Sequence, residues 1–192
     1  IGKKHILNTS VCKDPKGYLM AYESDGPTGW ETWLARSTDL SKWDRSNGLR
    51  FVGVVFANPT IRHVPPYHYL MFGTHRTASP ITDYEYHLAS TRYITCLMRS
   101  KDLITWELSP TKYPMLDAAV GEGINNTDAD LFEYQGHAYI YYITGDQKTW
   151  GAGRLAMYAG TMKECLEAHF PANVPMVRYD ARKAKFTYPK KK

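Results

Sequence analysis

"WLARSTDLSKWD" from Trp33 to Asp44 and "CLMRSKDLITWE" from Cys96 to Glu107 are two copies of one pattern, Arg-Ser-x-Asp-Leu-x-x-Trp. In each copy the residues before the serine indicate a strand, and the aspartate is of the type that caps tight turns. The tryptophan opens the next strand and is large enough to fill a hydrophobic layer. We therefore interpret both copies as structural elements that recur in register.

A longer repeat surrounds this pattern. "NTSVCKDPKGYLMAYE" from Asn8, "NPTIRHVPPYHYLMFG" from Asn58 and "DADLFEYQGHAYIYYI" from Asp128 each begin with Asn or Asp. Each continues through a turn that contains Gly or Pro and ends in an aromatic-rich segment. Aromatic and aliphatic runs on either side of such turns are typical of antiparallel β-hairpins. The sequence therefore predicts the same hairpin three times.

The third copy departs from the other two after its strand "RLAMYAG". The segment that follows, "TMKECLEAHF", places Thr161 three residues before Glu164, which is the spacing of a helix capping box. Its apolar residues share one face, so we expect a short helix from Thr161 to His169.

The repeated unit is a four-stranded antiparallel sheet of about 50 to 70 residues, and small sheets repeated at such a period predict an all-β fold, the β-propeller. We expect blades at about 5–52, 53–116 and 117–170, followed by a C-terminal tail over 171–192. Propellers usually close with four to eight blades. Three blades therefore predict either self-association or missing N-terminal blades, because an open end exposes strand edges.

Composition narrows the classes of function. The chain has 192 residues, a net charge of +5 that includes Lys190 to Lys192, and no basic stripe interleaved with aromatics, so we expect no nucleic-acid partner. Three scattered cysteines without a CxxC pattern predict neither a disulfide framework nor a metal site, and no cofactor motif is present. We expect no membrane span and recognise no signal peptide, which leaves a cytoplasmic or a secreted location open.

The Ser-x-Asp-Leu-x-x-Trp turns, with Asp-x-Asp-Leu-Phe before a Gly-x-x-Tyr-x-x-Tyr strand pair, resemble the five-bladed β-propeller glycoside hydrolases. The resemblance is to family 43 and its relatives in families 32, 62, 68 and 117, and it covers nearly all of residues 5–170. It implies that the chain corresponds to the C-terminal three blades of such a propeller. It also implies hydrolysis of glycosidic bonds in a plant or algal polysaccharide or oligosaccharide by paired carboxylates.

In that family the innermost strand of each blade begins with a residue that faces a central funnel, and several of these residues are the catalytic acids. Carried over by position, the funnel residues here are Asn8, Asn58 and Asp128, and only the third is acidic. The resemblance and the nearby acids give three candidate catalytic residues: Asp128, Glu23 and Glu122. The candidates for substrate binding are Asn8, Asn58, His75, Arg76, Trp150 and Asp146.

Asp130 has a different expected role from Asp128. We expect Asp128 to face the funnel and contact substrate, and Asp130 to bond nearby backbone N–H groups as a structural turn residue. Residues two apart in a strand point to the same face. We therefore expect that the strand starts after Asp128, and that a turn or bulge redirects one of the two acids.

Two other functions stay open. Asn at two of the three funnel positions favours a non-catalytic propeller that binds carbohydrate through amides and aromatic side chains. A third possibility is a propeller that serves as a scaffold for protein partners, since this fold hosts all three functions.

Overall fold

The computed structural model describes residues 5–27, 29–52, 56–75, 93–110, 114–117 and 119–189. Blade 1 contains β1 (Ile6–Asp14), β2 (Gly17–Gly26), β3 (Gly29–Ser37) and β4 (Arg50–Phe51). Blade 2 contains β5 (Ala57–Val64), β6 (Tyr67–His75), β7 (Tyr93–Ser100) and β8 (Thr105–Leu108). Blade 3 contains β9 (Asn125–Tyr134), β10 (His137–Gly145) and β11 (Gly151–Tyr158). Helix α1 (Met162–Glu167) and strands β12 (Val177–Asp180) and β13 (Lys185–Thr187) follow.

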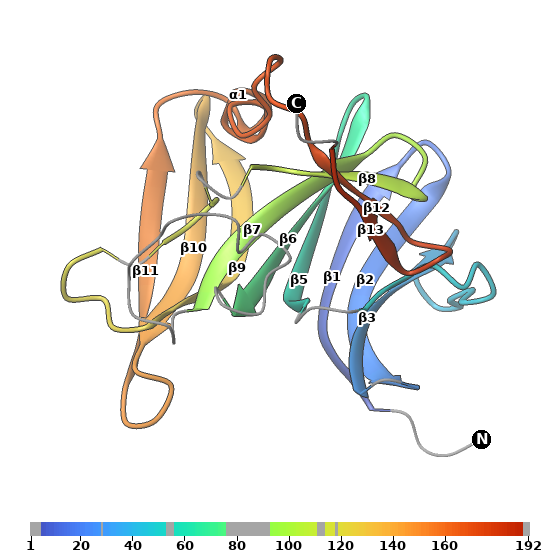
Figure 1. The fold of residues 1–192 in the computed structure, drawn as a ribbon, viewed down its shortest axis with the longest axis horizontal. Coiled ribbons are helices and arrows are strands. Elements are labelled where there is room, and N and C mark those ends of the chain that lie inside the picture. The colour runs from blue at the N-terminus through green and yellow to red at the C-terminus, as the bar shows by residue number, and fades with distance from the viewer. Residues whose placement is uncertain are drawn as a thin grey trace.

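The predicted all-β, antiparallel fold is confirmed. Figure 1 shows blade 2 lying between blade 1 and blade 3. The three predicted hairpins are β1–β2, β5–β6 and β9–β10, and each is antiparallel. Blade 3 has three strands among the described residues, where a fourth was expected. The helix begins at the predicted capping box, in which Thr161 and Glu164 bond reciprocally.

The repeated turn is stabilised by the same bonds in both copies. The hydroxyls of Ser37 and Ser100 each accept the backbone N–H of the leucine three residues on, at 2.9 Å in both turns. The carboxylates of Asp39 and Asp102 each accept two further backbone N–H groups. The leucine of each turn has a left-handed backbone, with φ of 64° and 66°. The serine and the aspartate thus fix the turn between strands, as the sequence predicts.

Two apolar layers hold the blades together. One joins the faces of blades 1 and 2, and includes Leu19, Phe51 and Phe72 with the fully buried Trp106. The other joins blades 2 and 3 beneath α1, and a smaller cluster on the outer face of blade 1 contains the half-buried Trp43. Blade 2, which lies between the other two, is therefore apolar on both of its faces.

The C-terminal segment is not a tail, and the expectation of one over 171–192 was wrong for its described part. Strand β12 pairs antiparallel with β8, and β13 pairs with β12 (Figure 1). Tyr179 of β12 is fully buried and stacks on Phe51 of blade 1. Its hydroxyl accepts the Val52 N–H at 2.8 Å. The segment therefore extends the sheet of blade 2 at its edge and packs against blade 1.

A buried polar group also ties blades 1 and 2 together. Asp14, at the end of β1, forms an ion pair with Arg36 of β3 at 2.6 Å and a hydrogen bond with His68 Nε2 of β6 at 2.7 Å. Burial alone would raise the pKa of the Asp14 carboxyl, but the bonds from Arg36 and His68 outweigh it and hold the pKa below its ordinary value.

We expect Asp14→Asn to lower the free energy of unfolding by roughly 3 kcal/mol at pH 7, because it leaves buried cationic and polar partners without their anion. The folded pKa lies below the unfolded one, so the ionised carboxylate stabilises the fold above about pH 4. That contribution is lost as the pH falls through the folded pKa. Urea unfolding at pH 7 and pH 3 should therefore show a smaller difference from wild type at pH 3. Asp25→Asn, at a half-exposed position, is the control, and a gap unchanged with pH would contradict the assignment.

Candidate functional site

The three predicted funnel residues lie together. Asn8, Asn58 and Asp128 have φ of 48°, 51° and 56°, the left-handed conformation that Asn and Asp tolerate best among residues other than Gly. The strand register shifts at the same place in β1 and β5, as in a β-bulge. All three line one cavity of about 180 Å³; its other lining residues are Thr9, Ser10, Pro59, Thr60, Ala129 and Asp130.

Glu23 occupies both of its carboxylate oxygens in holding the two asparagines. Asn8 donates through Nδ2 to Glu23 Oε2 at 2.7 Å and to Asn58 Oδ1 at 2.6 Å. The backbone N–H of Asn58 donates to Glu23 Oε1. The residue is buried and does not line the cavity. This geometry gives Glu23 a positioning role between blades 1 and 2, which differs from the catalytic role predicted for it.

The two neighbouring acids differ in their partners. Both Asp128 and Asp130 are exposed and line the cavity. Asp130 forms an ion pair with Arg62 and accepts the Leu131 N–H at 2.7 Å. Among the described residues, the side-chain bond of Asp128 is from the Thr127 hydroxyl at 2.9 Å. Strand β9 begins before Asp128, contrary to expectation, and Asp128 has a left-handed backbone inside the strand.

Arg62 is a residue that the sequence did not single out. It donates to the Leu131 carbonyl of blade 3 at 2.9 Å, to the Ser10 hydroxyl of blade 1 at 3.3 Å and to the Ile61 carbonyl at 2.8 Å. It thus joins the innermost strands of all three blades and places a cation beside Asp130. The equivalent positions in the other two repeats are Cys12 and Phe132, so the repeat pattern carried no sign of it.

Glu122 lies in a different environment. Its carboxylate accepts the Tyr142 hydroxyl at 2.7 Å and the Ala119 N–H at 2.9 Å, with Asn126 at 3.4 Å. Burial acts to raise the pKa of Glu122, but these bonds hold it below the ordinary value. The carboxyl is therefore ionised at neutral pH and suits a structural anion better than a proton donor. It does not line the cavity that contains Asp128.

Of the remaining predicted residues, Asp146 and Trp150 do not line this cavity. Asp146 accepts the backbone N–H groups of Lys148 and Thr149 in the β10–β11 turn. The bond from the Thr149 hydroxyl, together with these backbone bonds, lowers the pKa of the Asp146 carboxyl. It is a turn cap. Trp150 is 43% exposed beside that turn. Arg76 and the side chain of His75 lie outside the described residues.

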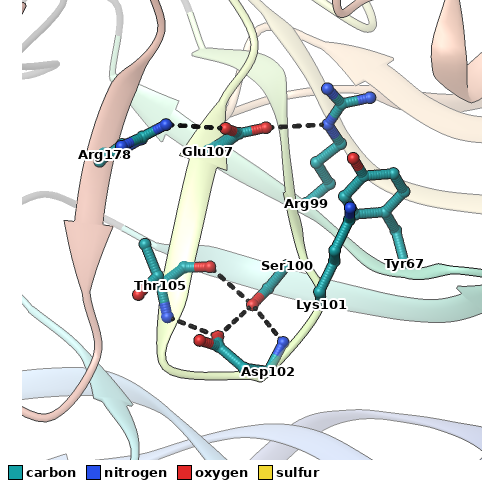
Figure 2. A pocket seen from close by; sticks show the side chains of 8 residues that line it. All are labelled: Tyr67, Arg99, Ser100, Lys101, Asp102, Thr105, Glu107 and Arg178. Atoms are coloured by element: carbon teal, nitrogen blue, oxygen red, sulfur yellow. Dashed lines mark hydrogen bonds and ion pairs between the residues drawn. The ribbon is translucent and has the colours of Figure 1, made fainter.

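A second cavity, of about 310 Å³, lies where the turn between β7 and β8 meets β12 (Figure 2). Figure 2 shows Glu107 between Arg99, at 3.2 Å, and Arg178, at 3.4 Å. Below them are the bonds of Asp102 within its turn. The charges of this cavity are thus largely engaged in holding the turn and β12 together.

The described part of the chain contains no group of three or more His, Cys, Asp or Glu side chains arranged to hold a metal ion. A search of those same residues finds no helix with the length and apolar character needed to cross a membrane.

The chain is similar to known proteins in structure but not in sequence. No protein-family model matches the chain, and no curated protein matches it in sequence. Among solved structures, it is similar to a BT0996 RGII complex, with a TM-score of 0.61 and 14% identity over 81% of this chain and 47% of that one. A structure described as a glycoside hydrolase gives 0.61 and 14%, over 82% and 46%. The Bombyx mori GH32 beta-fructofuranosidase BmSUC1 gives 0.53 and 17%, over 82% and 34%.

These likenesses establish the fold. The chain shares its fold with solved glycoside hydrolase structures, among them a GH32 beta-fructofuranosidase, and the fold agrees with the partial β-propeller that the sequence predicts. It spans less than half the length of the structures just named.

Proposed function

We propose that this chain is part of a propeller that binds carbohydrate and hydrolyses glycosidic bonds, with Asp128 as one of the reacting carboxylates. One observation carries the proposal. The first residues of three equivalent hairpins, one from each blade, line a single cavity, and Asp128 is the acid there whose oxygens are not held by an ion pair or by backbone N–H groups among the described contacts.

Glycoside hydrolysis needs two carboxyl groups that flank the bond, one of them protonated. Asp128 is exposed on the cavity and suits the role of nucleophile, base or tuning acid. Neither Glu23 nor Glu122 suits the proton donor, because the first is occupied by two asparagines and the second is held ionised. We therefore infer that the protonated acid of the pair lies outside the described residues. The proposed substrate class is a plant or algal polysaccharide or oligosaccharide.

A second candidate is a propeller that binds carbohydrate without cleaving it. Two of the three funnel positions carry Asn, which cannot exchange a proton but can bond sugar hydroxyls. The Asn58 side chain lines the cavity and accepts from Asn8, which leaves its own N–H groups for a ligand among the described contacts.

Calorimetric titration of the protein with a panel of plant and algal oligosaccharides, followed by measurement of reducing-sugar release, tests both candidates. Binding with release supports the hydrolase, and binding without release supports the second candidate. Asn58→Ala should weaken binding by about tenfold, since it removes one hydrogen-bonding group. Asn173→Ala, at an exposed position away from the cavity, is the control. Absence of binding to every sugar would contradict both candidates.

A further inference from the structure

The carboxylate of Glu23 determines which atoms of two neighbouring amide groups face each other. The backbone N–H of Asn58 can only donate, and it donates to Glu23 Oε1. The other carboxylate oxygen, Oε2, also only accepts, so the atom of the Asn8 amide that faces it at 2.7 Å is the nitrogen, Nδ2. The same nitrogen lies 2.6 Å from the Asn58 amide, so the atom of Asn58 that faces it is the oxygen, Oδ1. Both hydrogens of Asn8 Nδ2 are therefore used.

The orientation of Asn58 gives the cavity a hydrogen-bond donor. Because its Oδ1 faces Asn8, its Nδ2 is on the other branch of the amide, and among the described residues that nitrogen has no acceptor. Asn58 lines the same cavity as the exposed carboxylate of Asp128, which can only accept when it is ionised. The cavity thus presents a donor and acceptors together. Sugar hydroxyls both donate and accept, so they can satisfy this pair.

The repeat shows that the blade itself does not need an acid at position 23. Glu23 pairs with Leu7, and its equivalent Gly73 pairs with Ala57 in the same register. An added Cβ at Gly73 would lie 2.7 Å from Cγ2 of Thr127, so the side chain of the following blade fills that place. Burying a carboxylate is costly unless it is hydrogen-bonded. The buried acid of blade 1 therefore has a local task, and its described bonds are those to the two asparagines.

We propose that Glu23 is a positioning residue that sets the hydrogen-bond polarity of the cavity, so that Asn58 presents a donor to a sugar oxygen beside Asp128. The identity of the ligand rests on the proposed function, whereas the orientation of the amides does not. Glu23 acts only through the asparagines, because it is buried and does not line the cavity.

Glu23→Gln is expected to invert this polarity. The glutamine has nearly the same shape, and its oxygen can still accept the Asn58 N–H, but its nitrogen then replaces Oε2 and faces Asn8. Asn8 must turn its oxygen toward that nitrogen, and Asn58 must in turn direct its nitrogen toward Asn8. The Asn58 oxygen then faces the cavity, which places an acceptor where wild type has a donor.

Hydrogen exchange of the side-chain amides, measured by NMR without any sugar, tests the orientation. In wild type the Asn8 NH2 group should exchange at least about fivefold more slowly than that of Asn58, because hydrogen bonds protect it. Glu23→Gln should reverse this order. Loss of a resonance in Asn8→Asp or Asn58→Asp assigns each group. Equal rates in wild type, or an order that Glu23→Gln leaves unchanged, would overturn the proposal, and the wild-type order decides the case even if a variant does not fold.

Calorimetric titration with the same oligosaccharide panel tests the consequence for binding. Asn58→Asp still accepts from Asn8 but presents an acceptor to the cavity, so it mimics the inversion with Glu23 intact. Glu23→Gln and Asn58→Asp should each weaken sugar binding by at least about tenfold. Glu31→Gln is the matched control, because Glu31 is a buried acid of the same blade that does not line the cavity, and it should leave affinity unchanged.

The two measurements separate this inference from the proposed function. A reversed exchange order with sugar affinity unchanged in Glu23→Gln would overturn the role of Glu23 in recognition. Equal loss of affinity in Glu23→Gln and Glu31→Gln would do the same, because it would indicate general damage to blade 1. If wild type binds no sugar, the proposed function fails, whereas the expected exchange order would still support the positioning role of Glu23.

Discussion

Asp128→Asn is expected to lower the rate of glycoside hydrolysis by about 10²–10⁴-fold, the range that a positioned acid or base contributes to catalysis. The side chain is exposed, and its bond is to the Thr127 hydroxyl. Asn keeps the size, can still accept that bond and tolerates the left-handed backbone at φ 56°. The melting temperature should therefore change little. Measuring kcat and thermal melting on the same preparation separates loss of chemistry from loss of fold.

Asp130→Asn is the matched control, two residues along the same strand and on the same cavity. It should leave kcat close to wild type and lower the free energy of unfolding by up to about 1 kcal/mol. The loss follows from weakening the pair with Arg62 and the bond from the Leu131 N–H. Equal losses of activity in both variants, with neither melting temperature changed, would show that the roles of the two acids are divided wrongly.

The features that could be predicted from the sequence are those whose residue pattern occurs more than once in the chain. The Asn8, Asn58 and Asp128 positions were found by aligning three hairpins, and the structure brings them to one cavity. Their shared left-handed backbone gives the physical reason. Asn and Asp are the residues other than Gly that best accept such a bulge, so the repeat retains these types at that point.

Features that depend on a single residue meeting distant partners could not be predicted. Arg62 contacts Ser10 and Leu131, which lie far from it in the chain, and no repeat marks it. Tyr179 is buried against blade 1, although the sequence around it led us to expect a C-terminal tail. Asp146 is the opposite case. It lies near a strand end, as a site residue does, but the backbone N–H groups of three residues that follow it closely in the chain donate to its carboxylate.

Trp106→Ala is expected to be the most destabilising of the substitutions considered, at about 3–5 kcal/mol. The indole is fully buried between blades 1 and 2 and meets the Phe51 ring edge-on, with centroids 5.3 Å apart. Trp43→Ala is its internal reference, because the two residues are equivalent in the repeat. Each indole N–H donates to the leucine carbonyl of its own turn, at 2.8 Å for Trp106 and 3.1 Å for Trp43. The hydrogen bond therefore cancels in the comparison, and the difference reports burial at a blade junction.

Trp43→Ala should cost only about 1–2 kcal/mol in the isolated chain, because its ring is half-buried and loses less apolar surface. Urea unfolding followed by fluorescence measures both losses. Equal costs for the two substitutions would contradict the burial assigned to the two residues.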